Sequence, residues 1–187
     1  MIGVFAGNTS LYMVQLEDDT VLKAQSREVS GAQQGLQDRV THTLNLMVNQ
    51  ANVSGNPAWV SSSGAPGVVR VVEFPDMDEG ELEGAARFEA EEMISRDISE
   101  MDVDFAIVER TEGEEDEDGG LRVLVAAAPR QLNDAKMGLL NSAGLNCQGV
   151  TTAVAALTES FQNAHIDNSG GAVLLRVDKK HCNMVVL

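Results

Sequence analysis

The chain has 187 residues with 29 acidic and 13 basic side chains, which gives a formal net charge of -16. This charge argues against nucleic-acid binding, because proteins recognise a phosphate backbone with a basic surface. The longest unbroken apolar run, at 123–128, is far shorter than the roughly 20 residues that a membrane-spanning helix needs. The two cysteines do not make a disulfide framework, and the first residues lack the basic start of a secretory signal. The composition predicts a reduced, soluble, cytoplasmic protein.

The negative charge is concentrated in one segment of the chain. Residues 73–118 contain 20 acidic and 3 basic side chains, which leaves 9 acidic and 10 basic side chains for the remainder. Essentially all of the net charge therefore belongs to this segment. Such an asymmetry predicts a distinct module or a distinct surface.

The first part of the chain, residues 1–66, is predicted to form three strands, a helix and a fourth strand. Apolar runs at 2–6 and 11–16 are separated by a turn cluster, and a more polar third strand follows at 21–29. Apolar residues then recur at every third or fourth position, which is typical of an amphipathic helix. The last strand ends before a boundary marked by Gly and Pro at 64–67.

The acidic module, residues 67–145, is predicted to have the order strand, helix, strand, strand, helix. Asp76 or Asp78 is suited to cap the start of its first helix. The acidic and glycine-rich stretch at 111–120 joins the two later strands, and we expect it to be a mobile, solvated hairpin loop. Gly144 closes the last helix.

The end of the chain is again rich in small apolar residues. Residues 146–168 predict a short strand and a helix with a stripe of small apolar side chains, which would complete the first subdomain. Residues 169–187 contain two apolar segments around a polar turn. Because the chain stops inside the second of these segments, we expect it to be the front part of a longer protein.

Several short motifs occur in an order and spacing that resemble the PilM family. They include Val-Val-Glu-Phe-Pro at 71–75, Arg-Phe-Glu-Ala-Glu-Glu at 87–92, Val-Leu-Val-Ala-Ala-Ala-Pro-Arg at 123–130 and Ala-Gly-Leu at 143–145. The resemblance extends over residues 68–161. PilM is the cytoplasmic actin-like protein of type IV pilus assembly, and it is related to the division protein FtsA and to the GspL component of type II secretion.

The resemblance implies an α/β fold: an actin-like subdomain of the RNase-H type with a small, SHS2-like α/β subdomain inserted into it. Residues 1–66 and 146–168 would form the first subdomain, and residues 67–145 the insertion. Residues 169–187 would be the first hairpin of a second lobe. The chain would then be the N-terminal part of a two-lobed actin-like ATPase fold.

Actin-like ATPases hold the phosphates of their nucleotide on two β-hairpin turns, and the resemblance places the first turn at 3–10. The usual motif is Gly-x-Asp-x-Gly followed by Ser or Thr, whose backbone N–H groups and hydroxyls donate to the phosphates. Phe5 stands here at the position of the aspartate, and a phenyl ring can neither bind Mg²⁺ nor orient a nucleophile. What remains of the motif is Gly7, Asn8, Thr9 and Ser10. The structural alternative for this stretch is a plain hairpin turn.

The second turn usually carries Asp-x-Gly, and the resemblance places it near Arg176 and Asp178. The ungapped alignment puts Arg176 at the aspartate, and a shifted one that uses Asp178 puts Lys180 at the glycine, so the motif is broken in both. We expect a degenerate, non-hydrolysing pocket without a cofactor, which would take ATP and Mg²⁺ only if the second lobe is present. The alternative is an ATP-binding actin-like ATPase or a filament former.

We expect neither a metal site nor a catalytic triad. The histidines, His42, His165 and His181, are far apart in sequence, and the neighbours His181 and Cys182 would point to opposite faces of a strand. Cys147 and Cys182 are interpreted as small core hydrophobes.

Phe88 interrupts the acidic face of the predicted helix of the acidic module. Leu82 belongs to the apolar stripe of this helix. At 100° per residue, Phe88 lies about 120° away from Leu82 around the helix, beside Glu81 and Glu92. The ring is either packed at the edge of the module or against the first subdomain, or it is an aromatic anchor for a docking peptide. The candidate partner-binding residues are therefore Phe88, Glu81 and Glu92.

The resemblance implies a non-catalytic cytoplasmic adaptor at the inner face of the inner membrane, peripheral to the membrane through its partners. PilM receives the short cytoplasmic N-terminal tail of the membrane protein PilN in a groove between the first and the inserted subdomain. An acidic surface suits such a tail, because membrane proteins often carry Lys and Arg just inside the membrane. The sequence leaves open whether a pilus or a type II secretion platform is served, and self-association is a further expectation.

Overall fold

The chain folds as two units in the computed structural model. The model describes residues 1–7, 9–18, 20–29, 35–62, 67–94, 97–111, 119–164, 171–177 and 182–186. The first unit consists of Met1–Gly64 and Asp134–Leu187, and the inserted unit of Ala65–Asn133.

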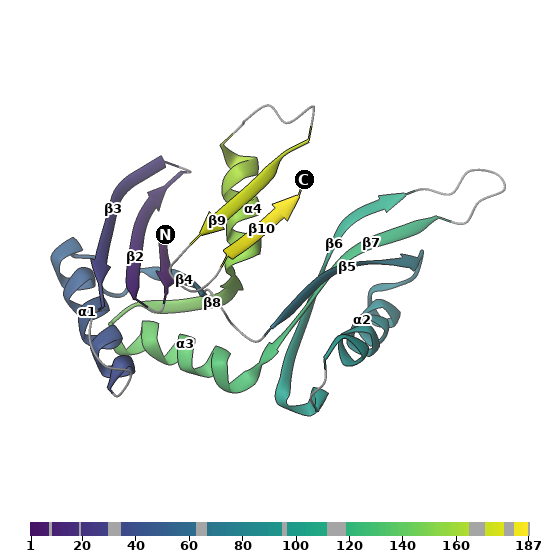
Figure 1. Ribbon diagram of the computed structural model, residues 1–187, viewed down its shortest axis with the longest axis horizontal. Helices are drawn as coiled ribbons and strands as arrows, with labels where there is room; N and C mark the ends of the chain where they lie inside the picture. Colours follow the sequence, from purple (N-terminus) through teal and green to yellow (C-terminus); the bar gives the residue numbers. More distant parts are fainter. Residues whose placement is uncertain are drawn as a thin grey trace. The chain divides into compact units, whose positions relative to one another are not determined.

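A five-stranded sheet forms the centre of the first unit, with the strand order β3-β2-β1-β4-β8 (Figure 1). Neighbouring strands run antiparallel from β3 to β1 and parallel from β1 to β8. The order of elements up to β4 is the one that the sequence predicts, with three strands, a helix and a strand. The strands are β1 (Ile2–Ala6), β2 (Ser10–Glu17), β3 (Thr20–Glu28), β4 (Pro57–Ser62) and β8 (Asn146–Thr152).

The core of the first unit lies on one face of this sheet. Because side chains alternate along a strand, every second residue of β1 points to this face, and Ile2, Val4 and Ala6 are buried there. The helices α1 (Leu36–Ala51) and α3 (Arg130–Ser142) supply the other half of the core. Their contribution consists of Leu44, Met47, Val48, Leu139 and Leu140.

The opposite face of the sheet, called the outer face below, is covered differently. The helix α4 (Ala153–Asn163) contacts β4 and β8 of the sheet, and it also contacts strand β10. Strands β9 (Val173–Val177) and β10 (Cys182–Val186) pair antiparallel as a separate hairpin (Figure 1). The outer face is thus bounded by one helix and this hairpin.

The inserted unit is built on a three-stranded antiparallel sheet with the order β5-β7-β6. One face of the sheet packs against α2 (Glu79–Met93), and Asp78 caps this helix by accepting a hydrogen bond from the N–H of Glu81 at 2.9 Å. Asp78 was one of the two caps expected from the sequence. The strands are β5 (Val68–Pro75), β6 (Met101–Thr111) and β7 (Gly120–Pro129), and a short 3-10 helix, η1 (Ile98–Glu100), precedes β6.

Strands β6 and β7 form the predicted hairpin. Their pairing extends to Thr111 and Gly120, which also share a hydrogen bond between the Thr111 hydroxyl and the Gly120 carbonyl at 3.1 Å. The predicted mobile loop falls largely on residues 112–118, which lie outside the described part of the chain.

The boundary between the two units differs from the one predicted at residue 145. It lies between Asn133 and Asp134, inside α3, because Leu139 and Leu140 pack into the core of the first unit. The amphipathic pattern of α3 identifies its buried stripe but not the sheet that buries it. The inserted unit therefore contains only the first residues of this helix.

Those first residues of α3 are tied to the start of β6. The carboxylate of Asp102 accepts hydrogen bonds from Nδ2 of Asn133 at 2.8 Å and from Nε of Arg130 at 3.1 Å. Arg130 also donates to the carbonyl of Met101 at 3.4 Å. The hydrogen bond from Asn133, with a smaller contribution from Arg130, holds the pKa of Asp102 below its usual range.

Candidate functional site

The outer face of the five-stranded sheet carries a row of aromatic side chains. Residues that face each other across paired strands lie on the same side of a sheet, and the register pairs Phe5 of β1 with Tyr12 of β2. The same register pairs Gly3 with Val14 on β2 and with Trp59 on β4. The three aromatic rings therefore share the outer face, while their sequence neighbours are buried in the core.

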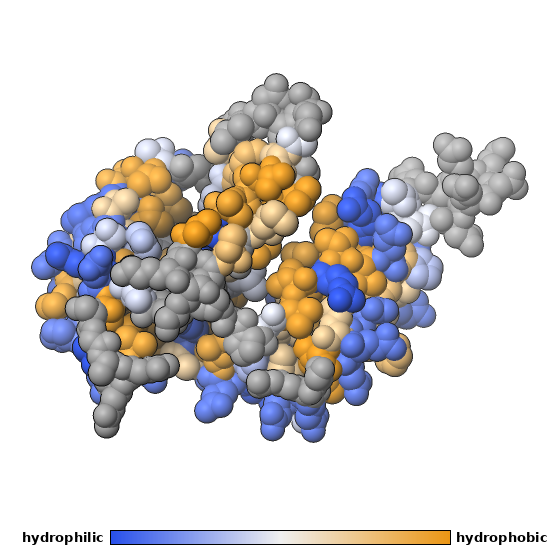
Figure 2. Space-filling model, in the orientation of Figure 1, coloured by the Kyte–Doolittle hydropathy of each residue, from blue (hydrophilic) through white to orange (hydrophobic). Residues whose placement is uncertain are grey.

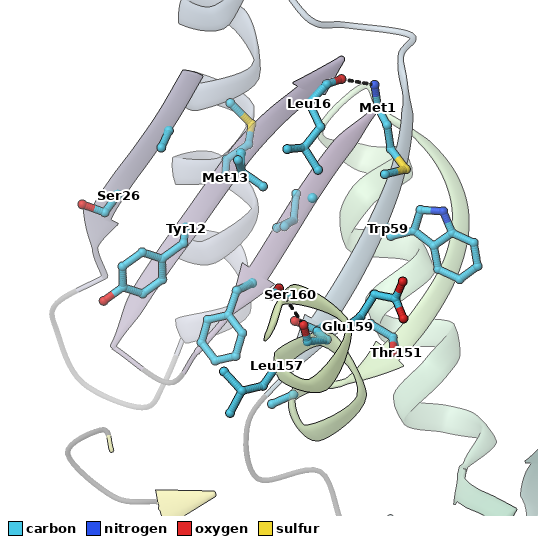
Figure 3. A pocket seen from close by; sticks show the side chains of 18 of the residues that line it. Met1, Tyr12, Met13, Leu16, Ser26, Trp59, Thr151, Leu157, Glu159 and Ser160 are labelled. Atoms are coloured by element: carbon cyan, nitrogen blue, oxygen red, sulfur yellow. Dashed lines mark hydrogen bonds between the residues drawn. The ribbon is translucent and has the colours of Figure 1, made fainter. Parts of the chain in front are cut away.

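A pocket of about 670 Å³ lies over this face. Its floor is formed by strands β1, β2 and β4, with Tyr12 and Trp59 among its lining residues (Figure 3). The helix α4 supplies one wall through Leu157, Glu159 and Ser160. The volume is in the range of small-molecule sites, and the lining is mainly apolar.

Arg176 of β9 brings a positive charge into this pocket. Its guanidinium carbon lies 4.1 Å from the centroid of the Phe5 ring, which is the geometry of a cation–π contact. Phe5 also contacts Tyr12, with ring centroids 6.0 Å apart and planes tilted by 58°. Phe5 and Arg176, which the sequence assigns to the two degenerate phosphate turns, are thus in direct contact.

The first turn itself is occupied by contacts within the chain. The N–H of Gly7 donates to the carbonyl of Ser10 at 3.0 Å, and the carbonyl of Thr9 accepts from the N–H of Val29 at 2.8 Å. The N–H of Gly7 is therefore bonded inside the hairpin rather than presented to a phosphate. Of the other predicted residues, Asn8 and Asp178 lie outside the described part of the chain.

Gly7 has a packing reason of its own. A Cβ at this position would lie 3.0 Å from Cε1 of Phe5 and 3.1 Å from the carbonyl oxygen of Ser10. Contacts this short are tighter than ordinary van der Waals packing, so the ring or the turn would have to give by a few tenths of an ångström. The glycine that the resemblance assigns to phosphate binding thus also leaves room for the Phe5 ring in this structure.

The contribution of Trp59 to the pocket was not predicted from the sequence. Its indole packs across β8 at Gly149, the residue paired with it in the parallel register. A Cβ at position 149 would lie 2.8 Å from both Cε3 and Cη2 of the ring. The apolar run around Trp59 indicates a strand, but nothing in the sequence indicates that the indole lies against Gly149 of another strand.

We expect Gly149→Ala to force the Trp59 indole out of its place. The new methyl group cannot be accommodated without moving the ring. Because the indole is 45% exposed it can turn toward solvent, so stability should fall by only about 1 kcal/mol, at the low end of what overpacking costs. Trp59 is the sole tryptophan of the chain, so a shift of its fluorescence emission reports the displacement directly. Gly84→Ala in α2 is the control, because nothing lies within 4 Å of a Cβ there. Unchanged emission in Gly149→Ala would contradict the packing described here.

Phe88 lies on the outward side of α2 in the inserted unit. Its side chain is 61% exposed, whereas Leu82, Ala86 and Ala90 of the same helix are buried against the sheet. Glu81 and Glu92 are also exposed. The Phe88 ring is therefore not part of the core of the inserted unit, and its role as an anchor for a docking peptide stays a prediction.

Neither a metal site nor a membrane-spanning helix is found in the part of the chain that the structure describes. No group of three His, Cys, Asp or Glu side chains there is arranged to hold a metal ion, and His165 and His181 lie outside that part. Cys147 is half-buried, but Cys182 is exposed, so the expectation that both cysteines are core residues is wrong for Cys182. None of the described helices combines the length and the apolar composition needed to traverse a bilayer.

Comparison with known proteins identifies the family. The family model described as type IV pilus assembly protein PilM matches residues 9–177. The chain belongs to this family. The sequence-based assignment to the PilM family is confirmed, although no curated protein sequence matches the chain.

Solved structures show the fold of the PilM family over the whole chain. A structure of the "PilM-PilN type IV pilus biogenesis complex" has a TM-score of 0.82 at 22% identity, and the match covers 100% of this chain and 57% of that one. The cytoplasmic domain of EpsL, an inner-membrane component of the type II secretion system of Vibrio cholerae, has a TM-score of 0.58 at 15% identity, covering 99% of this chain and 70% of that one. These likenesses confirm the predicted α/β, actin-like fold class.

Proposed function

We propose that the chain acts as a non-catalytic adaptor in the cytoplasmic part of a type IV pilus assembly platform, at the inner membrane. Its partner would be the cytoplasmic tail of a PilN-like membrane protein. Membership in the PilM family and the likeness to a PilM–PilN complex support this role. The weaker likeness to EpsL supports a secretion platform as the alternative setting for the same adaptor role.

The contact between Phe5 and Arg176 is the main support for a non-catalytic role. Actin-like ATPases need an acidic side chain near the first phosphate turn to organise Mg²⁺ and the attacking water. This position holds an apolar ring here, and a guanidinium covers that ring at 4.1 Å. Neither a phenyl ring nor a guanidinium offers the oxygen ligands that Mg²⁺ takes in proteins.

We therefore expect no ATP turnover and no stabilisation by ATP and Mg²⁺. Ligand at 100 times its Kd would stabilise a binding-competent protein by about 2.7 kcal/mol, so a thermal melt with and without nucleotide is a sensitive test. Phosphate release is measured in parallel, with Thr9→Ala and Ser10→Ala as controls for the turn. Steady turnover that disappears in either variant would show a working ATPase instead.

The proposed docking surface for the tail is the outward side of α2, with Phe88 as the apolar contact and Glu81 and Glu92 as the nearest charges. The segment around it carries most of the acidic residues of the chain, so it suits a tail that combines Lys or Arg with apolar residues. Binding of a fluorescently labelled tail peptide, measured by anisotropy, tests the adaptor role. A peptide with the same composition in scrambled order is the control.

A further inference from the structure

We propose that Arg176 is a built-in cation that keeps the β9–β10 hairpin attached to β1 without any nucleotide. In actin-like ATPases the phosphates lie between two hairpin turns and so connect them. Here the side chain of Arg176, from the second hairpin, reaches the ring of Phe5 next to the first turn. This inference rests on the proposed non-hydrolysing pocket, and it adds how the two hairpins are held together.

The position of the Phe5 ring is fixed by its surroundings. Gly7 lies against one edge, where a Cβ would be 3.0 Å from Cε1, and Tyr12 lies 6.0 Å away between centroids. Arg176 then covers the ring, at 4.1 Å from its centroid. A ring held in this way offers a preformed surface to the guanidinium, so little side-chain freedom of Phe5 is lost when the hairpin attaches.

On its described strands the hairpin attaches through the contact of β10 with α4 and through the side chains of β9 and β10 that are partly buried. A two-stranded hairpin is marginally stable on its own and depends on packing against the rest of the fold. Leu174, Arg176 and Val185 are its partly buried side chains on the described strands. Its remaining large side chains form an exposed apolar face, visible over β9 and β10 in Figure 2, which consists of Val173, Leu175, Val177, Met184 and Val186.

Cation–π attraction and simple apolar packing make different forecasts for substitutions of Arg176. Arg176→Met keeps the length and apolar stem but removes the charge, whereas Arg176→Lys keeps a cation that can lie over the ring. Phe5→Leu keeps an apolar side chain but removes the aromatic face. If the contact is a cation–π pair, Arg176→Met and Phe5→Leu should act alike, and Arg176→Lys should have a smaller effect.

Amide hydrogen exchange of β9 and β10 measures how often the hairpin detaches. We expect exchange there to become about tenfold faster in Arg176→Met and in Phe5→Leu, in the range of a partly desolvated cation–π contact, and less than about threefold faster in Arg176→Lys. The double variant should be little faster than either single one, because both remove the same contact. Unchanged exchange in Arg176→Met, equal effects of Met and Lys, or additive effects in the double variant would overturn the proposal.

Energy transfer gives a second, independent readout of the same event. Trp59 is the only tryptophan and lies on the sheet, while Cys182 is exposed on β10 and can carry a dansyl acceptor once Cys147→Ser removes the other cysteine. Arg176→Met should lower the transfer from Trp59 to the label. Arg27→Gln is the charge-matched control, because Arg27 of β3 donates to Gln50 of α1 away from the hairpin. Transfer as high in Arg176→Met as in the parent would count against the proposal.

The experiment separates this proposal from the proposed function. Hairpin attachment is measured without nucleotide, and ATP turnover and tail binding are measured by other assays. ATP turnover by the parent chain would contradict the non-catalytic role. The hydrogen-exchange results would still show whether Arg176 attaches the hairpin. Hydrogen exchange of β9 and β10 that stays slow when Arg176 is replaced would contradict only the proposed role of Arg176, and the adaptor role would stand.

Discussion

Leu82→Ala should unfold the inserted unit at a temperature where the first unit is still folded. Leu82 is fully buried and is the largest α2 side chain in the core of this unit. Replacing a buried leucine by alanine costs about 2–5 kcal/mol through lost burial and the cavity that remains. The core to which it belongs consists of eight buried residues, Leu82 included, on the described part of the unit, so such a loss is large relative to what the unit can contribute.

Two measurements distinguish local from global unfolding in this variant. Hydrogen exchange should accelerate in β5, β6 and β7 and stay slow in β1, since the two units have separate cores. Ala is a good helix former, so loss of α2 propensity does not explain the effect. A cost below about 1 kcal/mol, or equal acceleration in β1, would show that the core assignment or the independence of the units is wrong.

The sequence predicts the strands of both units from apolar runs that end at turn residues, and the structure adds that burial alternates along them. Ile2, Val4 and Ala6 are buried and alternate with residues of the outer face, and Leu121 and Val123 are buried in the same way in β7. The helix α2 was likewise predictable from its apolar stripe and from its Asp78 cap. These are local patterns, and the structure reproduces them.

Contacts between segments that are distant in sequence could not be predicted from such local patterns. Arg176 contacts Phe5 because β9 returns to the outer face of β1, and no spacing in the sequence announces this. The end of the inserted unit was misplaced for a related reason, since the stripe of α3 shows that it is buried without showing which core receives it. Gly149 is a third example, because its need for a bare backbone arises from the indole of Trp59 on another strand.

For the degenerate phosphate turn, the sequence indicates the meaning of Phe5, but the structure gives Gly7 a different meaning. Phe5 at the aspartate position indicates from sequence alone that hydrolysis lacks a residue. The retained Gly7 suggests that some phosphate binding survives, yet its N–H is bonded to Ser10 and its missing side chain makes room for the Phe5 ring. A residue that survives from a motif can therefore be kept for a different physical reason.

Phe88→Ala should weaken binding of the PilN-like tail by roughly 1–3 kcal/mol, the usual size for an aromatic anchor in an interface. The melting temperature should hardly change, because the ring is 61% exposed and leaves no cavity behind. Leu82→Ala on the same helix is the contrasting variant, since it removes a buried side chain and lowers stability. Anisotropy with the labelled tail peptide and a thermal melt of each variant provide the comparison.

The carboxylates beside Phe88 should act on a different step of binding. Glu81 and Glu92 are exposed, and charges at the rim of an interface act mainly on the rate of encounter. Glu81→Gln with Glu92→Gln should therefore slow association and reduce its dependence on salt, while dissociation stays close to that of the parent. Phe88→Ala should show the reverse, with faster dissociation and an unchanged salt dependence, because the ring contributes contact area and no charge. If Phe88→Ala binds the tail as tightly as the parent does, the tail docks elsewhere on the chain and the exposed ring has another use.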